Sequence, residues 1–191
     1  MIVTPILQFA HSMAEKAINP GDIALDMTMG NGNDTVFLAN CVGETGHVYA
    51  FDIQDDALHN TKQKIIDSGM ARANISLVKD CHSRFDTHIE VADLARVKAV
   101  LFNLGYLPGG DHALCTAGDT TVFALEKLLE HLQKSAVIIL VCYPGHPEGA
   151  VECERVLGFC KNIPTECAKV MRYEVLNSKN PAPFVLAIEK K

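Results

Sequence analysis

The chain has no long apolar run and no Cys-x-x-Cys pair, and each absence argues against a class of protein. No stretch approaches the about 20 apolar residues that span a bilayer, so we expect no membrane partner. The N-terminus lacks the basic and apolar segments of a signal peptide. Seven cysteines, an odd and scattered set, indicate reduced thiols in the cytoplasm rather than a disulfide frame. No residues have the spacing of metal ligands, and we expect no metal.

Basic residues are outnumbered by acidic ones, 17 Lys and Arg against 23 Asp and Glu, so the formal net charge is −6. A large nucleic-acid-binding surface needs Lys and Arg to contact the phosphates. The negative net charge therefore argues against a large surface of this kind, but it allows a small basic patch. Candidates for such a patch, most of them expected to be solvated, are Lys161, Lys169, Arg172, Lys179, Lys190 and Lys191. With 191 residues, 48% of them hydrophobic, the composition predicts one globular domain over residues 1–191.

The most informative stretch is residues 22–34. An apolar run, Ile23–Leu25, ends in Asp26 and is followed by the turn Gly30-x-Gly32. A buried parallel strand has this apolar pattern, and its ligand site lies beyond its carboxyl end. Glycine permits positive φ and close approach of a ligand to the backbone. We expect a helix to follow, capped by Asp34 or Thr35.

Two ligand classes use such a turn. A dinucleotide site needs Gly-x-Gly-x-x-Gly, but the third glycine position holds Thr35. Asp26 would repel a pyrophosphate, whereas it would suit a ligand that carries an ammonium and a sulfonium. That description fits S-adenosylmethionine, and Asp-x-x-x-Gly-x-Gly resembles motif I of Rossmann-like methyltransferases. The alternative at this point is a plain strand-turn-helix corner.

Polar residues also follow the next three predicted strands, 48–52, 75–78 and 97–102. Asp52 ends the first of these and is placed for a pair of ribose hydroxyls, with Gln54 lining the adenosine. Asp80 follows the second and is our candidate for the adenine amine, with Cys81 and His82 beside it. Asn103 follows the third. Four polar strand ends predict one elongated pocket along the carboxyl edge of a parallel sheet.

The remaining pattern completes the fold prediction. Apolar residues at helical spacing predict a helix over residues 5–18, in which His11 faces either the pocket or, as we favour, the interior. Asp119 is expected to cap a later helix. A fifth strand, 136–142, leads into a loop and a helix over 150–159. Turn residues between 167–176 and 184–188 predict a terminal hairpin. Five β/α units and a hairpin therefore indicate an α/β fold.

Three strings together resemble one family. Residues 26–35, residues 102–111 (Phe-Asn-Leu-Gly-Tyr-Leu-Pro-Gly-Gly-Asp) and residues 143–149 (Tyr-Pro-Gly-His-Pro-Glu-Gly) look like the YtqB family. That family was formerly labelled as rRNA methylases and is now associated with the MnmM activity. The resemblance extends over nearly the whole chain. Met27 and Met29 stand where the family usually has Ala and Cys, which are also small or apolar.

The resemblance implies the Rossmann-like class I methyltransferase fold, a mostly parallel seven-stranded sheet with a C-terminal antiparallel hairpin and helices on both faces. It also implies methylation of the aminomethyl group of 5-aminomethyl-(2-thio)uridine at the tRNA wobble position, with the anticodon stem-loop as partner. Ribosomal RNA or a small molecule is the alternative acceptor, and a homodimer is left open. Expected cofactor-binding residues in the first turn are Asp26, Thr28, Gly30, Asn31, Gly32, Asn33, Asp34 and Thr35.

The acceptor end contains the catalytic candidates. Asn103 to Tyr106 occupies the place of the Asn-Pro-Pro-Tyr motif of amino-methyltransferases, in which an Asn carbonyl and a backbone carbonyl hold an amine. Leu104 and Gly105 replace the prolines, which is consistent with an alkyl amine as acceptor. Such an amine must lose a proton before it attacks, so a nearby group must accept one.

Further candidates at this end are Asp111, Tyr143 and His146. Asp111 could bind the ammonium, and His146 could act as a base or be a turn histidine bonded to local backbone. Tyr106 and Tyr143 could stack on a flipped base or form a wall of the cofactor pocket. A nucleotide-binding oxidoreductase or a non-catalytic adenosine-binding module is the rival from another class, against which Asp26 and the missing third glycine argue.

Overall fold

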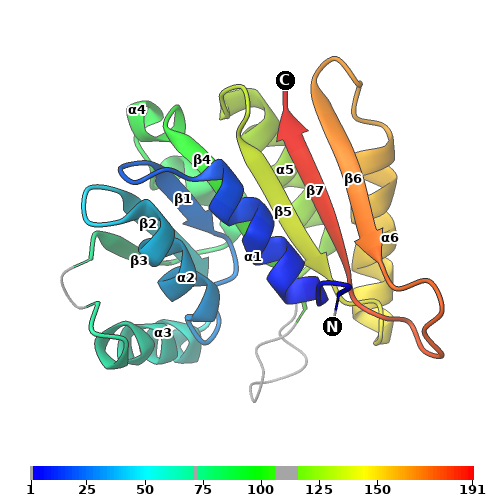
Figure 1. The fold of residues 1–191 in the computed structure, drawn as a ribbon, viewed down its shortest axis with the longest axis horizontal. Helices are drawn as coiled ribbons and strands as arrows, with labels where there is room; N and C mark the ends of the chain where they lie inside the picture. The colour runs from blue at the N-terminus through cyan, green and yellow to red at the C-terminus, as the bar shows by residue number, and fades with distance from the viewer. Residues whose placement is uncertain (1, 71–72, 106–115) are drawn as a thin grey trace.

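The computed structural model describes residues 2–70, 73–105 and 116–191 (Figure 1). Helices and strands alternate along most of the chain. The helices are α1 (Ile6–Ala17), α2 (Asn33–Val42), α3 (Asp55–Asp67), the 3-10 helix η1 (His82–Thr87), α4 (Val91–Leu94), α5 (Gly118–His131) and α6 (Pro147–Lys161). The strands are β1 (Ile23–Asp26), β2 (His47–Asp52), β3 (Ile75–Lys79), β4 (Val97–Asn103), β5 (Val137–Cys142), β6 (Ala168–Glu174) and β7 (Phe184–Lys190).

These strands form one seven-stranded sheet in the order β3-β2-β1-β4-β5-β7-β6. The first five run parallel, and β7 pairs antiparallel with both β5 and β6. The predicted α/β architecture and terminal hairpin are therefore confirmed. The strand order reverses direction between β1 and β4, and ligands of such sheets bind beyond the carboxyl ends of the strands at this point.

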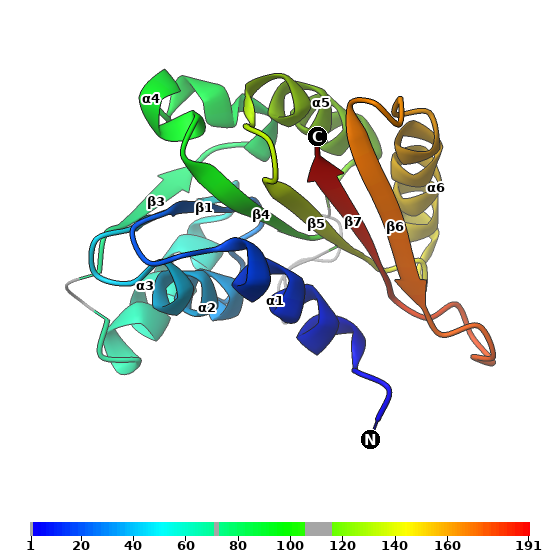
Figure 2. The same cartoon turned by 45° about the horizontal axis from the view of Figure 1, so that its top comes forward.

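Helices cover both faces of the sheet, as Figure 2 shows, with α1, α2 and α3 on one side and α4, α5 and α6 on the other. The β1 side chains explain how one short strand serves both layers. Ile23 and Leu25 belong to the core under α5 and α6, whereas Ala24 belongs to the core under α1 and α2. Because both faces are buried, the strand appears in the sequence as a continuous apolar run.

Small residues bring α1 close to the sheet. Ala10 and Ala14 on α1 are buried in the same core as Ala24 and Ala99 on the strands. A side chain of one carbon on each surface allows close contact between helix and sheet. This close contact holds His11, in the middle of α1, near the carboxyl ends of β1 and β4.

Two predicted helix caps are wrong. The N-cap of α2 is Gly32, at φ +77°, and no side chain caps this helix. Asp34 and Thr35 lie within the first turn of α2, where their side chains form hydrogen bonds to other elements. Similarly, α5 begins at Gly118 after Ala117, and Asp119 lies within its first turn, paired with Arg155 at 2.9 Å. Local sequence could not anticipate these distant partners.

No helix within residues 2–70, 73–105 and 116–191 is long and apolar enough to cross a membrane.

Candidate cofactor and acceptor site

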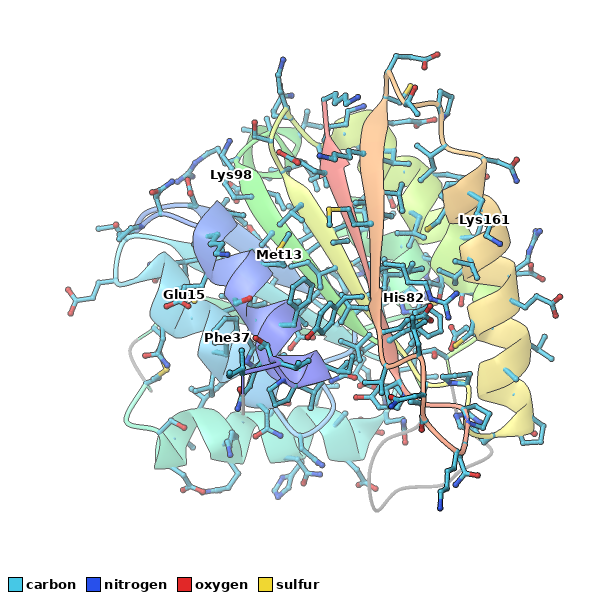
Figure 3. The ribbon with its side chains drawn as sticks, turned by 45° about the vertical axis from the view of Figure 1, so that its right-hand side comes forward. Met13, Glu15, Phe37, His82, Lys98 and Lys161 are labelled. Atoms are coloured by element: carbon cyan, nitrogen blue, oxygen red, sulfur yellow. The ribbon has the colours of Figure 1, made fainter. Side chains whose placement is uncertain are left out.

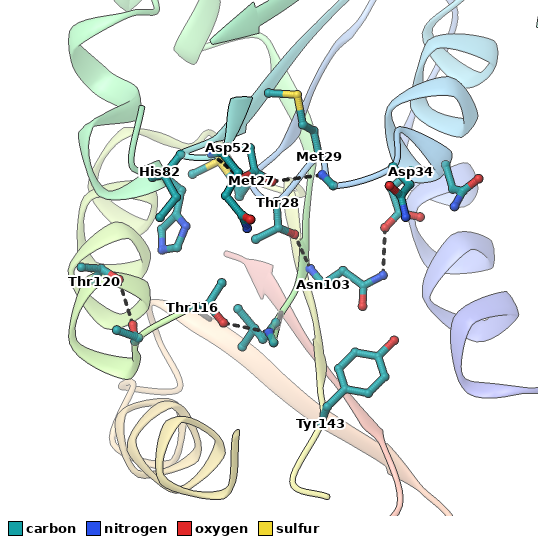
Figure 4. A pocket seen from close by; sticks show the side chains of 18 of the residues that line it. Met27, Thr28, Met29, Asp34, Asp52, His82, Asn103, Thr116, Thr120 and Tyr143 are labelled. Atoms are coloured by element: carbon teal, nitrogen blue, oxygen red, sulfur yellow. Dashed lines mark hydrogen bonds between the residues drawn. The ribbon is translucent and has the colours of Figure 1, made fainter. Parts of the chain in front are cut away.

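A cavity of about 930 Å³ lies at the carboxyl ends of β1 to β5. Its volume lies within the range of small-molecule sites. Two opposite ends can be distinguished in Figure 4, where Asp52 and His82 lie toward one end and Asp34, Asn103 and Tyr143 toward the other. We call the first the cofactor half and the second the acceptor half.

Asp26 supports the site from below. Its side chain is fully buried and is not among the residues that line the cavity. One carboxylate oxygen accepts a hydrogen bond from the Thr35 hydroxyl at 2.6 Å, and the other accepts one from the Thr28 backbone N–H at 3.2 Å. Burial and the neighbouring Asp34 carboxylate raise the pKa of Asp26 to about 7. Asp26 therefore ties the turn to α2, and its charge acts on a ligand through space.

The glycine turn between β1 and α2 is held in a defined shape. The Gly30 N–H donates to Asp52 at 3.1 Å, and the Asn31 side chain accepts from Asn60 at 2.9 Å. At Gly32, with φ +77°, an added Cβ would lie 2.9 Å from Cα of Thr61. Only glycine fits both that conformation and that contact. The Asn33 side chain, which follows this turn, is exposed and lines the cavity.

Asp52 connects two of the predicted strand ends. Its Oδ2 accepts from Gly30 N–H, and its Oδ1 accepts from Gln54 N–H at 3.1 Å. Both Asp52 and Gln54 line the cavity. Burial raises the pKa of Asp52 despite these backbone hydrogen bonds. The carboxylate is therefore fixed in place with accepting capacity still available for hydroxyl groups of a ligand.

Asp80, which follows β3 and was predicted to bind an adenine amine, already has two side-chain partners. The Asp80 carboxylate is engaged by Arg84, whose Nε lies 2.9 Å away, and by His88 at 2.8 Å. These partners lower the pKa of Asp80 to about 2. Asp80 and Cys81 still line the cavity, so the predicted adenine contact would come from a carboxylate already held by two other side chains.

His82 is the buried member of the same segment. Its ring packs edge-on against Phe102 with centroids 5.5 Å apart. Burial lowers the pKa of His82 to about 4, so the ring is neutral at physiological pH. In the described part of the chain, no hydrogen-bonding group reaches its Nε2.

Asn103 is the centre of the acceptor half. Its backbone N–H donates to the Thr28 hydroxyl at 2.7 Å, which joins the ends of β4 and β1. Its side-chain Nδ2 donates to Asp34 at 3.2 Å, as the dashed line in Figure 4 shows. Asp34 in turn lies 2.7 Å from Nε2 of His11 on α1. Three elements that are distant in sequence thus converge on one carboxylate.

Tyr143 and His146 follow β5 and have separate surroundings. The Tyr143 ring lines the cavity with its hydroxyl toward Asn103 and Asp34 (Figure 4), and burial and the Asp34 charge raise its pKa. Nδ1 of His146 accepts from the Gly149 backbone N–H at 3.0 Å and so caps α6. Of the two predicted uses of His146, the geometry matches the turn histidine bonded to backbone.

A further polar cluster closes the acceptor half. The Gly105 N–H donates to the Thr116 hydroxyl at 2.8 Å, and Thr116 N–H donates back to the Gly105 carbonyl at 2.9 Å. The Thr116 hydroxyl also donates to Glu152 at 2.5 Å, and Thr121 donates to the other oxygen of Glu152 at 2.9 Å. Tyr106 and Asp111, two of the predicted catalytic residues, lie outside the described residues.

Sequence reasoning missed Thr116 and Glu152. For His11 it named both the pocket and the interior and favoured the interior, but His11 lines the cavity and its side chain is 32% exposed. Only the helical position of His11, one turn from the exposed Leu7, gave a weak indication of the cavity. Glu152 is 3% exposed and lies on a helix whose pattern carries no sign of a hydroxyl partner 36 residues away.

The cavity fits a cationic adenosine cofactor. Asp34 and Asp52 present carboxylates at its wall, and Gly30 and Asn31 of the glycine turn also line it. No group of three or more His, Cys, Asp or Glu side chains that could hold a metal ion occurs in the parts of the chain that the structure describes.

Known proteins resemble this chain over almost its full length. A model of the family described as "Putative rRNA methylase" matches residues 48–189. The protein named tRNA (mnm(5)s(2)U34)-methyltransferase, chloroplastic, of Arabidopsis thaliana is 38% identical over 96% of this chain and 69% of its own length.

Two solved structures are similar over the full length of both chains. One, described as a "putative rRNA-methylase" from Clostridium thermocellum, has 40% identity and a TM-score of 0.94. The other, described as a "putative methyltransferase" from Streptococcus mutans in complex with SAH, has 32% identity and a TM-score of 0.88. SAH is the cofactor after loss of its methyl group. The predicted class I methyltransferase fold and the predicted cofactor, S-adenosylmethionine, are thereby confirmed.

Proposed function

The chain belongs to the family described as "Putative rRNA methylase" and is an S-adenosylmethionine-dependent methyltransferase, and we propose that its acceptor is transfer RNA. The proposed reaction is methylation of the aminomethyl group of 5-aminomethyl-(2-thio)uridine at the wobble position, which yields the methylaminomethyl form. The observation that carries this proposal is the 38% identity to a relative named for that wobble nucleoside. The partner would be the anticodon stem-loop.

The geometry of Asn103 is consistent with an amine acceptor. Asp34 accepts a hydrogen bond from the Asn103 amide nitrogen, so the amide oxygen remains to accept one from a substrate N–H. In an Asn-Pro-Pro-Tyr motif the two residues after Asn have no backbone N–H. Here Leu104 N–H donates to Val141 and Gly105 N–H donates to Thr116, so this backbone is held in another way. An sp³ aminomethyl nitrogen, which projects from the ring, suits this altered loop.

We assign the remaining predicted residues by their place in the cavity. Asp52 and Gln54 would bind the ribose side of the cofactor, and residues 80–82 would surround its adenine. Thr28, Gly30, Asn31 and Asn33 would contact the amino-acid portion. Gly32, which was also predicted to bind the cofactor, packs against Thr61 instead, and Asp26 and Thr35 hold the turn from below. Tyr143 would stack on the acceptor base, because single-stranded RNA is often bound through aromatic rings.

When bound, S-adenosylmethionine supplies an electrophilic methyl group on a positively charged sulfur. The protein must align the acceptor nitrogen with that methyl, exclude water and remove one proton from the ammonium. Positioning alone contributes about 7–11 kcal/mol in well-oriented reactions. The side-chain amide oxygen of Asn103, which is held in place, and the Asp34 carboxylate would orient the acceptor nitrogen for this transfer.

Ribosomal RNA is the second candidate acceptor, favoured by the description of the family model. Incubation of the enzyme with S-adenosylmethionine and either transfer RNA bearing the aminomethyl group or ribosomal RNA separates the two. Nucleoside mass spectrometry should show one added methyl on the wobble nucleoside. Methylation found on ribosomal RNA alone would replace the proposed acceptor and leave the cofactor assignment intact.

A further inference from the structure

Three polar side chains from three elements meet at the acceptor half of the cavity. They are His11 on α1, Asp34 in the first turn of α2 and Asn103 at the end of β4. Asp34 Oδ1 lies 2.7 Å from His11 Nε2, and Asp34 Oδ2 lies 3.2 Å from Asn103 Nδ2. All three residues line the cavity. Each oxygen of the carboxylate is therefore directed at a different partner.

These contacts determine which atoms remain available to a substrate. A carboxylate only accepts hydrogen bonds, so the nitrogen of His11 that faces it carries the hydrogen. In a neutral imidazole the other nitrogen, Nδ1, is then the basic one. Asp34 also stabilises the imidazolium that forms when Nδ1 takes a proton. This is the role of an aspartate that orients a catalytic histidine.

Packing holds the imidazole of His11 in this position. Its ring stacks on Phe37 of α2, with centroids 3.9 Å apart and planes inclined by 6°. Figure 3 shows Phe37 beside α1. The side chain is nevertheless 32% exposed, and the exposed part is in the cavity wall. A ring that was only a core residue would have neither this exposure nor a carboxylate partner.

We propose that His11 is the general base that takes the proton from the acceptor ammonium, with Asp34 as its positioning residue. This inference rests on the proposed function, because it requires an alkyl amine as the nucleophile. Asn103 holds the same amine through its amide oxygen but cannot accept the proton, because an amide oxygen is too weakly basic.

The step balances as follows. The ammonium on the nucleoside gives one proton to Nδ1 of His11, which becomes an imidazolium paired with Asp34. The neutral nitrogen forms a bond to the methyl carbon with its lone pair. The carbon–sulfur bond breaks, and its electron pair stays on sulfur. The product is a secondary ammonium and the uncharged thioether, and His11 later returns its proton to solvent.

Other titratable groups surround His11, and they must be separated from it in any pH experiment. Asp34 belongs to α2, Asp26 ends β1 beneath it, and Tyr143 follows β5. Further groups at the contacts of α1 are Glu15 on the same helix, Cys41 on α2 and Tyr173, whose strand packs on Phe9. Of these, Asp34 makes the direct contact with the imidazole.

The decisive experiment is single-turnover methylation of transfer RNA bearing the aminomethyl group, at saturating S-adenosylmethionine, for His11→Gln and the parent enzyme from neutral to alkaline pH. A glutamine amide can still donate to Asp34 but cannot take a proton. We expect the rate at neutral pH to fall about 100-fold. The deficit should shrink as pH rises, since the amine then loses its proton to solvent. Calorimetry should show unchanged cofactor affinity.

Two matched variants separate the loss of a base from the loss of ring packing and from a general effect of removing a histidine. His11→Phe keeps an aromatic ring on Phe37 and should show the same pH-dependent deficit. His59→Gln removes an exposed histidine on α3, away from this cavity, and should follow the parent profile. A His11→Gln deficit that is equal at every pH would indicate positioning alone and overturn the assignment, as would a parent-like rate. If the parent binds S-adenosylmethionine but leaves the aminomethyl group unmodified, the proposed acceptor fails and the inference with it.

Discussion

The two halves of the cavity are built in different ways. In the cofactor half, backbone N–H groups of a glycine turn and of a helix start bind Asp52, and the contacts arise within one β-α-β unit. In the acceptor half, side chains bind side chains that come from different units of the fold, as His11 and Asn103 do at Asp34, and Asn103 and Asp34 are 69 residues apart in the sequence. A site made of local backbone geometry leaves a recognisable motif, and a site made of convergent side chains does not.

Asp26 and Asp34 show the same contrast at the level of two carboxylates. Both lie near the glycine turn, but Asp26 is fully buried and binds that turn, whereas Asp34 lines the cavity and binds His11 and Asn103. Sequence position suggested that Asp26 would face the ligand. The structure assigns the exposed charge to Asp34. Variants that affect one half and spare the other test this division.

The largest effect should come from Asn103→Ala. This change removes the amide oxygen at the acceptor half and the hydrogen bond to Asp34. Because misplacement of a reacting group is costly, methyl transfer should slow about 100-fold or more. Cofactor affinity, measured by calorimetry, should change little. A variant that loses cofactor binding and turnover equally would show that the two halves are not separable.

Asp52→Ala should produce the opposite pattern. If Asp52 binds the ribose hydroxyls as proposed, the loss of its carboxylate should cost about 1.5–3 kcal/mol, or about 10- to 150-fold in affinity. The dissociation constant of S-adenosylmethionine should rise by that factor. The rate at saturating cofactor should remain near that of the parent. NAD should not bind either protein, and tight NAD binding by calorimetry would contradict the cofactor assignment itself.

The raised pKa of Asp26 should make the free energy of unfolding depend on pH in the absence of cofactor. Its pKa is raised from 3.8 to about 7, so between these values the folded chain binds more protons than the unfolded chain. The contribution of Asp26 to the free energy of unfolding should therefore fall as pH rises, by about 2 kcal/mol between about pH 5 and 7. His82, whose pKa burial lowers to about 4, contributes in the opposite direction over much of the same window. Urea titrations should therefore show Asp26→Asn gaining stability relative to the parent as pH rises.

The pH dependence that remains in that variant comes from groups of both signs. Burial raises the pKa of Asp52 and of Glu152 and lowers that of His82. A double variant, Asp26→Asn with Asp52→Asn, should therefore gain further stability relative to the single one as pH rises. An unchanged slope in Asp26→Asn would mean that the buried carboxylate does not titrate in this window.

The smallest effect is expected at His146, which lies in the acceptor half but caps α6. His146→Ala should lower the free energy of unfolding by about 1 kcal/mol, the usual effect of losing a cap, whereas His146→Asn should retain most of it. The pH profile of methyl transfer should keep its shape in His146→Asn. A shifted profile would restore His146 as the base and contradict the role proposed for His11.

Sequence patterns located the cofactor half well. Of the four polar strand ends that were predicted to line one pocket, Asp52, Asp80 and Asn103 do line it, whereas Asp26 is buried beneath it. Asp80 shows the limit of that reasoning, since its neighbours Arg84 and His88 already occupy its carboxylate. A pattern places a residue at a strand end, but it does not tell which other side chains compete for the same oxygen atoms.

The sequence by itself determined the order of strands and helices, the glycine turn and the class of cofactor, because these depend on local periodicity and on conformations that few residues adopt. Only the tertiary structure decided which carboxylate reaches the cavity, that His11 faces it and that Glu152 holds Thr116. The physical reason is that a side chain's role depends on partners brought close by packing. Those partners are separated in sequence by distances that no local pattern records.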